Sequence, residues 1–169
     1  VADETKVEIR LQNGEKIEGE VVPSSFKGDL ILVRAALPDG PVAKLGEEKS
    51  GGLWTLGEDI SARSVKAYPQ GKLLLDAAKD KPYARLHHTA YSQPGNSGGA
   101  LVNEKGELVG ITASGGAGRF EAVPASQIAA LQTQSGADHV SASAEMGKHV
   151  RECTLMLEKA QRLGDRLPD

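Results

Sequence analysis

Apolar and polar residues alternate near the start of the chain. Residues 7–11 read Val-Glu-Ile-Arg-Leu, which is the period of a half-buried β-strand. The dipeptide Asn13-Gly14 follows and is typical of a tight hairpin turn, after which residues 17–22 supply a returning strand. The apolar run at residues 30–33 has strand length and predicts a strand buried on both faces. The chain therefore opens with three predicted strands.

Short strand patterns continue along the chain between turn signals. They fall at residues 53–56, 60–67, 72–75 and 83–88, after a glycine- and proline-containing loop at residues 38–52. A second hairpin is predicted from the runs Ala-Leu-Val and Leu-Val-Gly-Ile on either side of the turn Asn-Glu-Lys-Gly at residues 103–106. Many short strands with regular turns predict an all-β barrel or sandwich.

The pattern becomes helical after residue 123. Residues 124–131 carry proline in the first turn and predict a short helix, and residues 132–138 predict a polar linker. Residues 141–163 predict a longer helix with an apolar stripe at steps of four, three, four and three: Met146, Val150, Cys153, Leu157 and Ala160. We expect this stripe to pack on the chain's own barrel, and an intermolecular helix contact is the alternative.

Composition narrows the class of protein. The 169 residues include 20 Lys+Arg and 23 Asp+Glu, and this balance excludes a generally basic nucleic-acid binder and an acidic disordered chain. No segment approaches the roughly 18–20 apolar residues of a membrane-spanning helix. The single cysteine excludes an internal disulfide framework. A globular domain with one buried core is expected.

The most distinctive segment for a candidate catalytic function is residues 93–102, Gln-Pro-Gly-Asn-Ser-Gly-Gly-Ala-Leu-Val. A serine nucleophile needs an exposed hydroxyl on a tight turn, beside backbone N–H groups aimed where an oxyanion forms. The glycines around Ser97 permit such a turn, because glycine adopts positive φ without steric cost. A glycine-rich turn between two strands is the structural alternative.

The same residues carry a family resemblance. Residues 95–103, followed by Gly-Glu-Leu-Val-Gly-Ile at 106–111, resemble the nucleophile region of trypsin-like (chymotrypsin-fold) serine proteases, and in particular their HtrA/Deg branch. Further segments resemble that family in the required order, over roughly residues 1–134. They are the strands after the catalytic histidine (7–22), the aspartate strand (28–33), the connection between barrels (41–46) and the strand before the closing helix (120–124).

The resemblance implies a fold and a division of the chain. It implies two antiparallel six-stranded β-barrels, the first incomplete, with helices at the C-terminus. Residues 1–40 would form the partial first barrel, and 41–123 the interbarrel connection and the second barrel with its nucleophile loop. Residues 124–134 would be the closing helix, and 135–169 the linker and amphipathic C-terminal helix. The exposed edges of the first barrel would be covered by an absent segment, a partner or the tail.

The resemblance also implies catalytic roles. Ser97 would be the nucleophile of an acyl-enzyme mechanism, and Asp29 would orient a histidine. The backbone N–H groups of Gly95 and Ser97 would form the oxyanion hole. An aspartate beside a strand is also typical of a turn cap, which is the alternative for Asp29.

Substrate contacts follow from the same resemblance. The specificity pocket would be lined by Tyr91, Ser92, Thr112 and Gly115. None of these is acidic, so cleavage after Lys or Arg is not expected and a small or apolar residue is. Residues 113–116, including Ala113 and Ser114, would pair with an extended substrate by strand addition.

The general-base histidine of the family is missing from the chain. By the family's spacing it would precede Val1 by one or two residues. His87 and His88 lie on the strand that leads to the nucleophile loop and are interpreted as strand residues, one of them facing solvent; His139 and His149 belong to the linker and tail. As printed, the chain should be inactive, because losing one triad member costs several powers of ten in rate.

Two interpretations of the missing histidine remain. A longer protein could carry the histidine and act as a serine endopeptidase on proteins or peptides, or the fold could be a non-catalytic module that binds a protein partner. No metal or cofactor site is predicted, no nucleic-acid partner is expected, and helix-mediated self-association remains open. The resemblance favours a periplasmic or secreted location.

Overall fold

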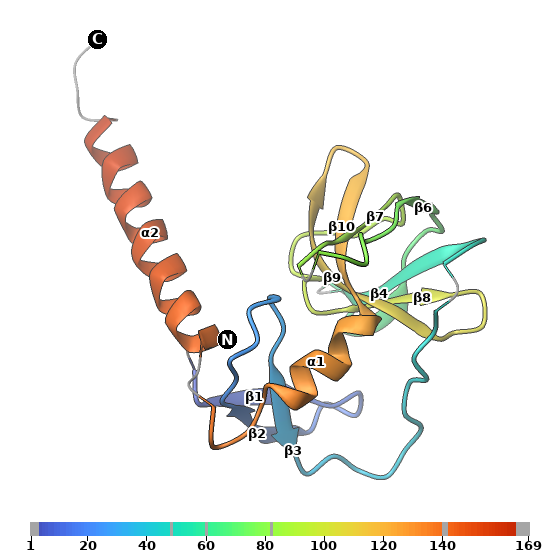
Figure 1. Cartoon of the computed structure of the whole chain (residues 1–169), viewed down its shortest axis with the longest axis horizontal. Helices are drawn as coiled ribbons and strands as arrows, with labels where there is room; N and C mark the ends of the chain where they lie inside the picture. Colours follow the sequence, from blue (N-terminus) through green and yellow to red (C-terminus); the bar gives the residue numbers. More distant parts are fainter. Residues whose placement is uncertain (1–3, 48, 60, 82, 140–141, 165–169) are drawn as a thin grey trace.

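The computed structural model of the chain describes residues 4–47, 49–59, 61–81, 83–139 and 142–164 (Figure 1). In these ranges the chain is mostly antiparallel β-structure with two α-helices, as expected for a β-rich fold. The smaller sheet contains β1 (Lys6–Arg10), β2 (Lys16–Val22) and β3 (Leu32–Ala35). The larger sheet contains β4 (Leu53–Asp59), β5 (Ser64–Ala67), β6 (Leu73–Leu75), β7 (Leu86–His88), β8 (Ala100–Asn103), β9 (Leu108–Gly116) and β10 (Arg119–Pro124). The helical segments are the 3₁₀ turn η1 (Ala125–Gln127), α1 (Ile128–Thr133) and α2 (Ala142–Gly164).

The two sheets are open in the described part of the chain. The smaller has the order β1-β2-β3 and the larger the order β5-β4-β8-β9-β10-β7-β6. An isolated antiparallel bridge between Leu53 and Gly71 brings the chain before β6 to β4, but the edge strands β5 and β6 do not pair in the sheet order. The expected closed six-stranded barrels are therefore not confirmed. Ile60 and Ser141, predicted to begin elements, lie outside the described residues.

The small sheet forms as the alternation predicts, but it is thinly packed. β1 and β2 pair with Ile9 opposite Ile17, across a turn in which Gly14 has φ +85°. β3 pairs with β2, and no other described strand lies beside it. Val33 of β3 is 37% exposed, so the prediction of a strand buried on both faces is wrong.

The large sheet holds the core. Fully buried apolar side chains come from five of its strands and from the segment after β7: Leu53, Leu86, Ala90, Leu101, Val109 and Ala122. The predicted second hairpin is confirmed, with β8 and β9 joined by a turn at residues 104–107. The Asn103 side-chain oxygen accepts the N–H groups of Lys105 and Glu107, each at 3.0 Å, which fixes that turn.

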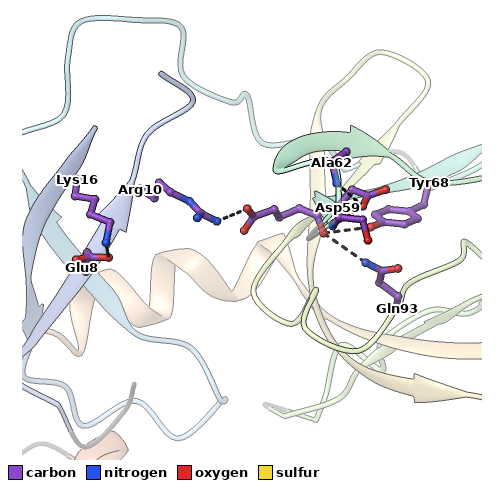
Figure 2. Close-up of polar contacts among 9 residues, drawn as sticks. Glu8, Arg10, Lys16, Asp59, Ala62, Tyr68 and Gln93 are labelled. Carbon is purple, nitrogen blue, oxygen red and sulfur yellow. Dashed lines mark hydrogen bonds and ion pairs between the residues drawn. The ribbon is translucent and has the colours of Figure 1, made fainter. Parts of the chain in front are cut away.

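A few polar contacts join the two sheets. Arg10 at the end of β1 pairs with the Glu58 carboxylate of β4, and the backbone carbonyl of Glu58 accepts the Tyr68 hydroxyl at 3.3 Å (Figure 2). The chain after α1 returns to the small sheet, where the Ser25 N–H donates to the Gln134 carbonyl at 2.9 Å. In Figure 1, α1 lies between the two sheets. The helix predicted at residues 124–131 is thus present as η1 and α1.

Helix α2 extends away from both sheets (Figure 1). The large apolar side chains of its stripe are exposed: Met146, Val150 and Leu157. The expectation that the stripe packs on the chain's own barrel is therefore wrong. An ion pair of 3.4 Å between Arg151 and Glu4 connects α2 to the start of the chain. None of the described helices combines the length and apolar character needed to cross a lipid bilayer.

Candidate active site

The predicted nucleophile loop, residues 93–99, is a tight turn that leaves Ser97 exposed. Gly95 and Gly98 have φ values of +97° and +89°, which side chains rarely adopt. The Gly98 N–H donates to the Thr112 carbonyl at 2.7 Å, and the Thr112 N–H donates to the Gly99 carbonyl at 2.8 Å. The end of the loop is therefore fixed on β9.

The Ser97 side chain and the backbone N–H groups beside it are the groups that the sequence analysis predicted to be catalytic. The Ser97 hydroxyl donates to the carbonyl of Ala113 at 2.8 Å. Among the described residues, no acceptor receives a hydrogen bond from the backbone N–H of Gly95 or of Ser97. An oxyanion hole consists of neighbouring donors of this kind, which have no acceptor within the protein.

The nucleophile loop is also connected to β4. Asn96 is buried, its N–H donates to the Gln93 carbonyl at 3.1 Å, and its carbonyl accepts the Gly99 N–H at 2.9 Å. The Gln93 side chain in turn donates to the Glu58 carbonyl at 3.5 Å, as Figure 2 shows. The position of Ser97 thus depends on β4 and β9, which belong to one packed sheet.

Asp29 lies in a different setting. It precedes β3, has φ +63°, and its side chain is 74% exposed. Its carboxylate accepts a hydrogen bond from Arg85 Nη2 at 3.1 Å. The structure does not bring Asp29 into hydrogen-bonding contact with Ser97, whose hydroxyl is bound to Ala113. The sequence pattern contains no signal for the Arg85 contact, because it joins residues 56 positions apart.

The four histidines have other surroundings. His88 is fully buried and stacks on Phe120, with ring centroids 6.1 Å apart. Burial lowers the pKa of His88 to about 4, against a smaller opposing contribution from the backbone at Ala90. His87 is partly exposed and its Nδ1 accepts a hydrogen bond from Arg119 Nε at 3.3 Å. His139 contacts Ser25 at 3.0 Å and His149 is exposed on α2, so none of the four contacts Ser97.

Aromatic rings fill the region of the predicted specificity pocket. The Tyr91 ring lies edge-on to Phe120 at 6.0 Å and 5.8 Å from the Tyr68 ring. A Cβ at Gly115 would lie 2.6 Å from Phe120 Cδ1, so glycine is required there for the ring to fit. Thr112, predicted to line the pocket, is buried. Phe120 is the residue that the sequence analysis missed, since only the register of β9 and β10 places it opposite Gly115.

The strand predicted to bind substrate has an open edge. β9 pairs with β10 as far as Gly116, but its pairing with β8 ends at Ile111 opposite Ala100. Residues 113–116 therefore have no strand partner on the β8 side in the described chain. An extended peptide could pair there with main-chain hydrogen bonds.

Other candidate sites do not coincide with this loop. A depression of about 450 Å³ is lined by residues of the 47–51 loop and of the β6 region, including the Lys49–Asp76 ion pair of 2.7 Å, and it does not include Ser97 or Asp29. We therefore take the nucleophile loop, with its exposed serine, as the candidate site, and not this open depression. In the described ranges, no group of three or more His, Cys, Asp or Glu is placed to hold a metal ion.

Sequence comparison identifies relatives of the chain. Residues 1–111 match the family of trypsin-like peptidase domains. A "Serine protease HtrA-like" of Staphylococcus aureus (strain bovine RF122 / ET3-1) is 29% identical over 131 residues, covering 68% of this chain and 17% of that protein. A "Probable periplasmic serine endoprotease DegP-like" of Pseudomonas putida (strain GB-1) is 31% identical over 129 residues, covering 69% and 26%. The chain thus spans about a sixth and a quarter of these two relatives.

Solved structures share the fold. The HtrA-type protease AlgW, solved with a decapeptide, superposes with a TM-score of 0.64 at 22% identity, over 76% of this chain and 43% of that one. The inactive form of Rv3671c protease superposes with a TM-score of 0.59 at 17% identity, over 73% and 69%. The described strands therefore adopt the arrangement of these proteases.

Proposed function

Because the chain belongs to the family of trypsin-like peptidases, we propose that it carries the nucleophile of a serine endopeptidase that cleaves proteins or peptides. The observation that carries the proposal is the nucleophile loop. Ser97 is exposed on a turn fixed by two hydrogen bonds to Thr112, beside the unbonded N–H groups of Gly95 and Ser97. The HtrA-like and DegP-like relatives support the same activity for a longer protein.

In the proposed reaction, Ser97 Oγ attacks the carbonyl carbon of the scissile peptide. A histidine, which we place just before Val1, takes the hydroxyl proton and then gives it to the leaving amine. Asp29 holds that histidine, which requires its carboxylate to exchange the Arg85 contact for the imidazole. The N–H groups of Gly95 and Ser97 stabilise the oxyanion, and water releases the acyl group from Ser97.

The proposed substrate is an extended peptide added at the open edge of β9. Main-chain bonds to residues 113–116 would align it, with the side chain before the scissile bond directed between Tyr91, Ser92 and Thr112. Phe120 occupies part of this region, beside Gly115. We propose that this space accepts a small or apolar side chain, since none of its walls is acidic.

A protease-like module that binds a protein partner without cleaving it is the second candidate. The observation that favours it is the state of the two catalytic side chains. Asp29 is bound to Arg85 and Ser97 to the Ala113 carbonyl, and no histidine of the chain contacts either. The open edge of β9 would serve a bound partner as well as a substrate.

We propose a periplasmic or secreted location, supported by the relative whose name describes it as probably periplasmic. We also retain the proposed division of the chain, with a second unit at residues 41–123 that contains the nucleophile loop.

The test is peptide hydrolysis by the chain extended upstream with its own encoded residues. The proposal expects hydrolysis of a casein or small-residue peptide substrate, lost by at least about 10³-fold in Ser97→Ala. Ser126→Ala, at an exposed serine of η1, is the matched control and should retain full activity. No hydrolysis by the folded extended protein, with a peptide still bound at β9, would establish the binding module instead.

A further inference from the structure

The apolar stripe of α2 is uncovered, and its side chains extend over most of the helix. Five large apolar side chains on one side of α2 are between 56% and 72% exposed: Met146, Val150, Met156, Leu157 and Leu163. Monomeric proteins rarely leave a contiguous row of this kind in water. A further structural element is therefore expected to cover it.

The positions of these residues define a specific contact face. At 100° per residue, the stripe at steps of four and three is widened on one flank only, by His149, Met156 and Leu163. The other flank is small or polar, with Gly147, Thr154 and Gln161. The far face of α2 carries charged residues and one large apolar side chain, Leu155.

We infer that α2 pairs with α2 of a second copy of this chain, in antiparallel orientation. A repeat of 3.5 residues is the pattern by which helices pair with each other. In a parallel pair the apolar flank of one helix would lie against the polar flank of the other. In an antiparallel pair the two apolar flanks meet, so Met156 contacts Met156 of the second copy and Thr154 lies opposite its own equivalent.

The antiparallel register also matches charge and length. Centred near Leu155, it places Cys153 opposite Leu157 of the second copy and Val150 opposite Ala160, so the pairing uses nearly all of Ala142–Gly164. Just outside the apolar flank, Glu152 lies near Lys159 of the second copy, twice by symmetry. Opposite charges at the edge of the contact favour this orientation.

The placement of the sheets fits this orientation. The sheets are connected to the N-terminal end of α2, and the exposed Arg151–Glu4 ion pair lies in the first half of the helix. Antiparallel helices separate the two sets of sheets by most of the roughly 35 Å that 23 residues span, so they do not collide. One helix face is smaller than the about 800 Å² per partner of a standard interface, so dissociation in the micromolar range is expected.

The first test is sedimentation equilibrium of the chain from about 10 to about 500 µM. We expect the mass to rise from one copy towards two. Leu157→Glu, on the stripe, should keep the chain monomeric, whereas the matched Leu155→Glu, on the opposite face, should not change the association. Circular dichroism of both variants checks that α2 remains folded. A chain that stays monomeric throughout, or a dimer that survives Leu157→Glu, would overturn the inference.

The second test fixes the orientation through the single cysteine. Parallel helices place Cys153 against Cys153 of the second copy, whereas the antiparallel register separates these residues by about one helical turn, beyond disulfide reach. Mild oxidation should therefore give no covalent dimer of the unchanged chain, and a covalent dimer of Leu157→Cys through Cys153. A rapid Cys153–Cys153 crosslink in the unchanged chain would contradict the antiparallel pairing.

Discussion

The two sheets differ in how firmly each one holds its part of the candidate site. The large sheet buries six core residues completely and holds Ser97 by hydrogen bonds from two strands. The small sheet ends at β3, leaves Val33 37% exposed and presents Asp29 in an exposed contact with Arg85. One packed sheet thus positions the proposed nucleophile, whereas the proposed role of Asp29 requires structure added to the small sheet.

The largest change in the free energy of unfolding is expected from acid, because His88 is buried in the large sheet. The folded chain keeps this side chain neutral to about pH 4, whereas the unfolded chain protonates it near 6.5. The unfolded state therefore binds more protons in this window, and the free energy of unfolding should fall as the pH drops from 6.5 to 4, by about 3 kcal/mol in total.

Urea unfolding at a series of pH values measures this loss. His88→Leu should flatten that part of the dependence, because leucine does not titrate and both ring nitrogens of His88 lack a well-aligned hydrogen bond. At pH 7.5, where His88 is neutral in both the folded and the unfolded state, equal free energies of unfolding of the two proteins would serve as the baseline. A slope unchanged by His88→Leu would assign the acid sensitivity to other groups, the small sheet included.

The contrast in packing is tested by one substitution made in both sheets. Val109 of β9 is fully buried, whereas Val33 of β3 is 37% exposed. Val109→Ala should lower the free energy of unfolding by about 2–3 kcal/mol, and Val33→Ala by less than about 1 kcal/mol. Thermal and urea unfolding measure both. Equal losses would mean that β3 is covered in solution, which would remove the contrast.

Phe120 tests how tightly the large sheet fills the proposed specificity pocket. In the upstream-extended protein, Phe120→Ala should raise kcat/KM for a peptide with Phe before the scissile bond, relative to one with Ala, by about tenfold. Both substrates suffer equally from any loss of folded enzyme, so the ratio is its own control. An unchanged ratio would show that Phe120 does not limit the pocket.

The smallest effect is expected at the ion pair between the sheets. Arg10 and Glu58 are both partly exposed, so their coupling should be about 0.2–1 kcal/mol and should weaken with salt. A double-mutant cycle with Arg10→Gln and Glu58→Gln measures it. The Lys16–Glu8 pair within the small sheet, at 3.0 Å, is the matched comparison. A coupling well above that range would mean that the two sheets are joined more firmly than their contacts indicate.

The sequence predicted the local features and missed those that depend on distant contacts. Alternation and turn residues were sufficient for β1, β2 and the β8–β9 hairpin, because these pair neighbouring segments. The burial of β3 was predicted wrongly, because an apolar run does not reveal whether another layer covers it. The packing of α2 was wrong for the same reason. A stripe specifies a contact face but not its occupant.

The candidate site was predicted unevenly for a related reason. The turn around Ser97 follows from its glycines and the strands next to it, which are close in sequence. The Arg85 contact of Asp29 and the position of Phe120 beside Gly115 depend on strand register and on residues far apart. Neither leaves a periodic signal in the sequence.

The most direct test of the proposed nucleophile is covalent labelling of the upstream-extended protein with a fluorophosphonate, followed by peptide mapping. This reagent modifies a serine only when a base activates its hydroxyl and an oxyanion hole receives the phosphoryl oxygen. We expect one modified site, Ser97, with labelling lost in Ser97→Ala and retained in Ser126→Ala. An extended protein that contains the upstream histidine, folds and remains unlabelled at Ser97 would contradict the proposed catalytic function.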